Sequence, residues 1–276
     1  MPHLRHLLIL LVLFGLAVGG CEPTPGLYDW EKGALEATVY FVRANDAGIW
    51  DEPEIHLLDR PSDENLREKL QLLFTGSPHD WLLGSAAPTD VEVLSVELRD
   101  GVVFVDVDAT ITTHRAASAQ EAAFAQQLAH TAVTSGGDAV QLLVDGEPVD
   151  ELWGHLDWSL PIEPDPDALS PITIVEPEAG PGELTVGPDE VVVRGEARVL
   201  EATFTIRLRR ADGVIFTEDV VTASEGAPER GTWEHTFTLT GSTGPGTYTI
   251  EVQEHDPSEG EGRPPFLSSR QINVGN

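Results

Sequence analysis

The chain has 276 residues and a formal net charge of −31, because 47 Asp and Glu outnumber 16 Lys and Arg. Phosphate backbones bind clustered Lys and Arg, so the composition excludes nucleic acid as a partner. The single cysteine excludes a disulfide framework and any zinc site with more than one thiolate. At about 150 residues per domain the length predicts two domains, and a hydrophobic content of 41% is enough for a core in each.

Residues 1–20 have the features of a secretory signal. Arg5 provides a basic start, and an unbroken apolar run extends from Leu7 to Val18. This run is too short for a bilayer core, which needs roughly 20 helical residues, and it fits a signal peptide. It closes on an apolar residue, two small residues and a cysteine: Val18, Gly19, Gly20 and Cys21.

This closing sequence resembles the bacterial lipobox. Small side chains give the signal peptidase access to the scissile bond, and the thiol carries the diacylglycerol. We therefore expect Cys21 to be lipidated and to become the N-terminus, with residues 21–33 as a flexible tether. Lipid alone would then hold the protein outside the cytoplasmic membrane. An ordinary signal peptide with a chance cysteine is the alternative.

Residues 34–160 mix the periodicities of strands and helices. The predicted order β-β-α-β-β-α-β is that of an α+β domain, a small sheet with both helices on one face. Asp100-Gly101 predicts a hairpin between two of the strands. The predicted strands cover residues 35–42, 55–58, 91–98, 102–107 and 139–144.

Two helices are expected in this domain. Ser62 is expected to cap the first, whose apolar face carries Leu66, Leu70 and Leu73. A capping box from Ser118 to Glu121 is expected to open the second, which ends near Thr134. The apolar face of the second helix carries Phe124, Leu128 and Ala132.

A proline-rich segment separates this domain from an all-β one. Residues 161–171 contain four prolines between acidic residues, which predicts a semi-rigid linker. Residues 172–276 alternate apolar and polar positions, as at Phe204, Ile206 and Leu208. Roughly seven such strands predict an antiparallel, immunoglobulin-like β-sandwich. Because it lacks paired cysteines, packing alone must hold its sheets together.

Short segments in a fixed order resemble two known families. In the first half they are Val39–Phe41, Leu72–Gly76, Val93–Val96, Asp100–Asp106, Leu128–Thr131 and Val140–Gly146. These resemble the GerM family of sporulation and spore-germination lipoproteins. In the second half they are Val191–Ala197, Leu200–Phe204 and Gly231–Trp233 with Phe237. These resemble the immunoglobulin-like domain of bacterial spore germination. The resemblance implies no catalytic residues.

Two groups of residues are candidates for chemistry. Asp106 and Asp108 lie two apart on a strand, so both carboxylates point to one face and could form a calcium site or an acid/base pair. A half-buried strand explains the same pattern, since valines occupy its other face. The segment with Trp153, His155, Asp157 and Trp158 could bind a sugar, a peptide or a protein. Packing against its own sheet is the favoured interpretation.

Other sequence patterns give little or no indication of a functional site. The acidic loop His255–Gly262 lacks EF-hand spacing and is interpreted as an ordinary loop. Gly76–Asp80 contains Ser, His and Asp, but such close neighbours do not form a triad. No metal-binding histidine pair, nucleophile elbow, P-loop or dinucleotide fingerprint occurs. No metal, cofactor or catalytic residue is therefore expected.

The sequence favours a lipid-anchored envelope protein that acts as a non-catalytic docking or assembly module. Its expected partners are the membrane, through the lipid, and an envelope protein or the cell wall. The alternative is a protein that binds or hydrolyses wall glycans or peptides, with Asp106 and Asp108 as carboxylates and Trp153 or Trp158 as a platform.

Overall fold

The computed structural model describes residues 28–29, 34–45, 48–58, 65–75, 82–177, 185–187, 189–239, 244–255 and 264–275. Four predicted features lie outside these residues: the lipobox with Cys21, the Ser62 cap, the Gly76–Asp80 segment, and the loop after His255. Among the described helices, none has the length and apolar character to cross a membrane.

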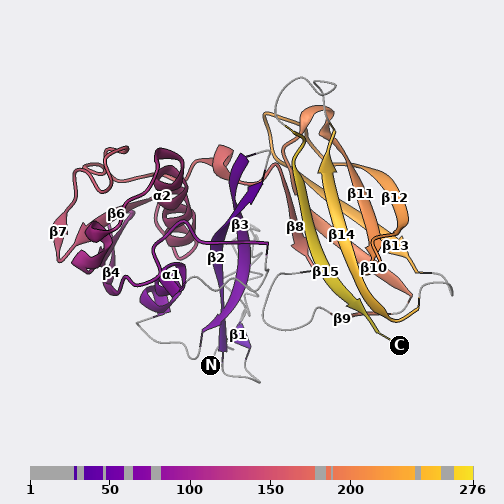
Figure 1. The fold of residues 1–276 in the computed structure, drawn as a ribbon, viewed down its shortest axis with the longest axis horizontal. Coiled ribbons are helices and arrows are strands. Elements are labelled where there is room, and N and C mark those ends of the chain that lie inside the picture. The colour runs from indigo at the N-terminus through magenta and orange to yellow at the C-terminus, as the bar shows by residue number, and fades with distance from the viewer. Residues whose placement is uncertain are drawn as a thin grey trace, which may run out of the picture.

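The first domain consists of two sheets with both helices between them (Figure 1). One sheet has the order β1-β2-β3, formed by Tyr28–Asp29, Ala34–Asn45 and Gly48–Leu58. The other has the order β4-β5-β6-β7, formed by Val93–Arg99, Val102–Val107, Ala139–Val144 and Glu147–Pro148. Helix α1 (Asn65–Thr75) contacts β2 and β4, and α2 (Ser118–Val133) contacts β2, β3 and β6.

The α+β class is confirmed, but the expectation of one sheet with both helices on one face is wrong. The physical reason lies in α2, whose buried residues surround much of its circumference, so it packs on two sides. Tyr28–Asp29, inside the segment expected to be a tether, pair with Ala34 and Leu35 as strand β1. The Asp100-Gly101 hairpin is confirmed, with positive φ angles at both residues.

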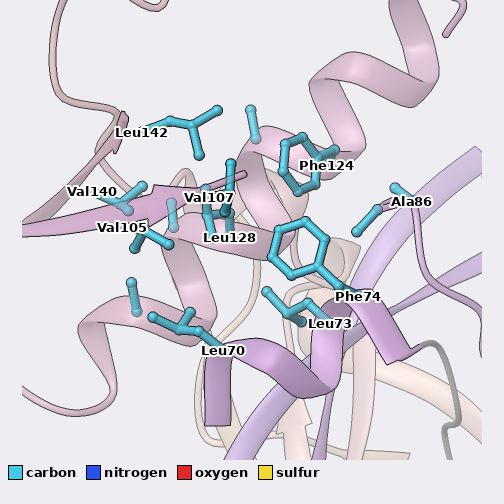
Figure 2. Close-up of a cluster of buried hydrophobic side chains, with 14 of the residues drawn as sticks. Leu70, Leu73, Phe74, Ala86, Val105, Val107, Phe124, Leu128, Val140 and Leu142 are labelled. Carbon is cyan, nitrogen blue, oxygen red and sulfur yellow. The ribbon is translucent and has the colours of Figure 1, made fainter. Parts of the chain in front are cut away.

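The core of this domain extends from the helices to both sheets, and Figure 2 shows the part that faces the second sheet. Helix α1 contributes Leu70, Leu73 and Phe74, and α2 contributes Phe124 and Leu128, all with no exposed surface. The predicted apolar faces of both helices are thus confirmed. Facing them from β5 and β6 are the buried residues Val105, Val107, Val140 and Leu142.

The second domain is the predicted sandwich. One sheet has the order β13-β10-β8, formed by Gly231–Thr238, Glu190–Ala197 and Ile172–Glu176. The other has the order β12-β11-β14-β15-β9, formed by Ile215–Thr222, Thr203–Arg210, Gly246–Glu254, Leu267–Val274 and Thr185–Val186. Short 3-10 turns occupy Ala109–Thr113 in the first domain, Pro166–Ala168 between the domains and Leu200–Ala202 in the sandwich. The sandwich core includes Phe204, Trp233 and Phe237.

A close backbone approach explains one glycine of the sandwich. At Gly195, on β10, an added Cβ would lie 2.0 Å from the Thr173 carbonyl oxygen and 2.6 Å from the Trp233 ring. The β10–β8 register also shifts between Arg194 and Gly195. The absent side chain therefore lets β8 and the buried indole pack directly on the β10 backbone.

Candidate functional site at the domain junction

The β2–β3 hairpin carries charged side chains that are buried where the two domains meet. Arg43, Asp51 and Glu52 each expose less than 5% of their surface. Because successive residues of a strand point to opposite sides, Asp51 and Glu52 have different partners. Asp51 contacts α2, whereas Glu52 contacts Arg43 and Ser170.

On the first side, Asp51 pairs with His130 of α2. The His130 Nδ1 and Asp51 Oδ2 atoms are 2.8 Å apart, and both residues are buried. The Tyr40 ring lies against the imidazole, with ring centroids 5.1 Å apart. Burial raises the pKa of Asp51, and the hydrogen bond from His130 partly opposes this rise. The pair joins the hairpin to α2.

On the other side, Glu52 accepts three hydrogen bonds. Arg43 forms a bidentate pair with it, with distances of 2.5 Å from Nε to Oε1 and 2.9 Å from Nη2 to Oε2. The Ser170 hydroxyl donates to Oε1 at 2.8 Å, and the Ser170 amide donates to the Asp51 carbonyl at 3.1 Å. Ser170 lies in the predicted linker, so the hairpin also holds the segment that connects the domains.

The sandwich contacts the same hairpin. The Trp50 ring packs edge-on against Phe266, with centroids 4.9 Å apart, and the Asn45 amide donates to the Leu267 carbonyl at 3.3 Å. Arg230 donates from Nη2 to the Ser170 carbonyl at 3.0 Å. Burial lowers the pKa of the Arg230 guanidinium. The hairpin thus contacts α2, the linker and the sandwich at once.

The linker has further contacts on both sides. The Asp165 amide donates to the Gln126 side chain of α2 at 2.7 Å, and Arg198 of the sandwich pairs with Asp167. These bonds, together with those of Ser170, restrict the linker more than its proline content alone predicts. The junction is therefore arranged to hold the two domains in one orientation. Its carboxylates are used in hydrogen bonds between elements.

The structure places Asp106 and Asp108 in backbone-supporting roles. Asp106 Oδ1 accepts from the Gly146 amide at 2.8 Å, and Asp108 Oδ1 accepts from the Glu92 amide at 2.9 Å. A hydrogen bond from the Thr110 hydroxyl holds the pKa of Asp108 below its usual value. Within the described residues, no three His, Cys, Asp or Glu side chains gather as metal ligands would.

The aromatic segment is organised around Glu121 of α2. Glu121 Oε1 accepts from the Trp153 amide and the Trp158 indole, at 3.2 Å and 2.9 Å, and Oε2 accepts from the His155 amide at 3.0 Å. Trp158 is buried, whereas Asp157 is exposed and accepts from the Ser159 amide and hydroxyl. Trp153 and Trp158 also pack on Phe124.

Two of these arrangements differ from the sequence predictions. The capping box is wrong: Ser118 begins α2 without a side-chain capping bond, Ala117 is the N-cap residue, and Glu121 is buried beneath the aromatic segment. The second strand begins at Gly48 rather than near residue 55. The sequence did not indicate the first part of this strand, because charged residues such as Asp51, Glu52 and Glu54 are typical of a loop.

Two family models match the chain. Residues 38–150 match the model described as "Sporulation and spore germination", and residues 172–261 match "Immunoglobulin-like domain of bacterial spore germination". The chain is GerM-like in its first domain and immunoglobulin-like in its second. Both descriptions name a process and a fold rather than a reaction. No curated protein matches the chain.

Solved structures that are similar to this chain include proteins from Bacillus subtilis and Clostridium perfringens. The tandem GerMN domains of the sporulation protein GerM from Bacillus subtilis are 20% identical, with a TM-score of 0.40, over 51% of this chain and 48% of that one. This chain thus spans about half of that structure. A putative lipoprotein from Clostridium perfringens is 24% identical, with a TM-score of 0.33, over 48% and 88%. The first GerMN domain of the Bacillus protein is 18% identical, with a TM-score of 0.34, over 49% and 97%.

Proposed function

We propose that this chain is a lipid-anchored envelope protein whose two domains act together as a non-catalytic docking module in spore formation or germination. Both matched families belong to that process. The observation that carries the docking role is the junction, in which one hairpin contacts α2, the linker and the sandwich. A fixed orientation lets two surfaces meet a partner at once without an entropic cost of aligning them.

The sandwich offers an edge for such docking. Strand β12 is the last strand of its sheet, and the Val220 side chain on it is 66% exposed. Edge strands bind extended segments of other proteins through backbone hydrogen bonds. An envelope protein is therefore the partner we propose, with the cell wall as the other surface within reach of an anchored protein.

The anchor is tested by changing Cys21, the thiol that lipidation requires. Cells that express the Cys21→Ser variant should release the protein from the membrane fraction, whereas Thr24→Ser, a matched change three residues away, should leave it there. Ultracentrifugation followed by immunoblotting measures both. Membrane retention of the Cys21→Ser variant would show that another element anchors the protein.

A further inference from the structure

Lys69 of α1 is a buried cation without an acidic partner. Only 3% of its surface is exposed, and no carboxylate of the described residues forms an ion pair with it. Its Nζ instead donates to the hydroxyls of Thr134, at 2.7 Å, and of Ser135. Buried lysines are normally paired with acids. This one, in a chain rich in acids, is not.

The Thr134 and Ser135 hydroxyls differ in the acceptors that are available to their own protons. The Thr134 hydroxyl donates to the Thr131 carbonyl at 2.9 Å, so its oxygen serves only as an acceptor for Lys69. The Ser135 hydroxyl has no described acceptor for its proton other than Lys69. Ser135 is exposed at the end of α2, whereas Lys69 lies buried behind it. A lysine that merely capped α2 would bond the terminal carbonyls.

The amine can exist in its basic form near neutral pH. Burial lowers the pKa of Lys69 from 10.5 to about 8. Roughly a tenth of the molecules therefore carry a neutral amine at pH 7. A neutral Nζ offers a lone pair to the Ser135 proton, which is the arrangement of a base beside a nucleophile.

We propose that Ser135 is a nucleophilic serine, activated by Lys69, that accepts an acyl group from an activated acyl ester. The Ser135 Oγ–H bond breaks as Oγ bonds to the acyl carbon, and the proton moves to Lys69 Nζ. The ester's C–O bond then breaks, and the leaving oxygen takes that proton from Nζ. The products are an acylated Ser135, a free alcohol and the neutral amine.

Ser135 is exposed, so an acyl donor can reach its hydroxyl directly from solvent. Gly136 and Gly137 follow it and present no side chains. The Gly137 amide donates to no acceptor in the described part of the chain. Covalent acylation here goes beyond the docking role proposed above and does not depend on it.

The test is acetylation of the full chain by p-nitrophenyl acetate, followed by peptide mass spectrometry. Ser224 is the internal control, because it is exposed and hydrogen-bonded only to Thr232 among the described residues. Ser135 should react about 100-fold faster than Ser224. Its rate should rise with pH through a midpoint near 8, where Lys69 loses its proton.

Variants distinguish activation of Ser135 by Lys69 from the mere solvent exposure of Ser135. Lys69→Met should lower the Ser135 rate about 100-fold, and Thr222→Val, a change at an exposed position of β12 in the sandwich, should leave it unchanged. Equal rates at Ser135 and Ser224 in the unaltered protein would overturn the proposal even if Lys69→Met failed to fold. So would an unchanged Ser135 rate in a folded Lys69→Met variant.

Discussion

At the scale of single residues, the junction depends on two neighbouring acids with different tasks. Asp51 bonds His130 on α2, and Glu52 bonds Arg43 and Ser170. Their sequence predicts solvent exposure, because Asp and Glu are seldom buried unless paired. The pairing partners lie 79 and 118 positions away for His130 and Ser170. No local pattern could have revealed them.

The Asp51–His130 bond makes a prediction with a defined sign. At pH 7, Asp51→Ala should lower the free energy of unfolding by about 2 kcal/mol, because it leaves the buried imidazole without its partner. Asp51→Asn should cost less, since the amide oxygen still accepts from Nδ1. Urea unfolding followed by circular dichroism measures both.

The pH dependence follows from the raised pKa of Asp51. The folded protein holds the proton more tightly than the unfolded chain, so Asp51 contributes stability below its unfolded pKa, about 4. That contribution is lost as pH rises through the folded pKa. From pH 4 to pH 7 the unaltered protein should therefore lose stability relative to Asp51→Asn. A constant difference between the two would contradict the assigned burial.

At the scale of elements, hydrophobic periodicity predicted those helices and strands whose burial depends on apolar packing alone. The apolar faces of both helices and the alternating strands of the sandwich were predicted correctly, because those residues are buried for their hydrophobicity. The predictions that were wrong involve polar residues whose hydrogen-bond partners lie far away in the sequence. Glu121 has the spacing of a capping box, yet its carboxylate binds a segment over 30 positions away.

Glu121 should therefore control the order of the aromatic segment. Glu121→Ala leaves three described N–H donors without their acceptor, and should lower the free energy of unfolding by about 3 kcal/mol. Because Trp153 and Trp158 lose their anchor, tryptophan emission should shift to longer wavelength before global unfolding. Gln120→Ala, at the exposed neighbouring position, is the control. Identical urea curves for the two variants would contradict this role of Glu121.

At the scale of the whole molecule, the two domains share contacts that sequence analysis did not indicate. The Asn45 side chain reaches the Leu267 carbonyl across 222 positions of sequence, and Trp50 packs with the sandwich core. Both fold classes follow from composition and periodicity. The contacts of the hairpin with the sandwich depend on the arrangement of complete domains, so the candidate site could not be predicted.

Charge also acts at this scale. A net charge of −31 repels an anionic membrane surface, so the folded body of a lipid-anchored protein should extend into solvent. In the anchored protein that we propose, the edge strand β12 would then lie within reach of other envelope proteins. The same charge favours a partner with basic side chains beside its docking strand.

In-cell photo-crosslinking at Val220 tests the docking claim most directly. A photoreactive amino acid replaces Val220 on β12 or, as a matched control, Leu160 at the end of the first domain; the two are 66% and 68% exposed. The account predicts one discrete crosslinked envelope protein from position 220, absent from position 160 and lost when Cys21→Ser removes the anchor. The same products from both positions, or none from position 220, would contradict docking through the sandwich edge.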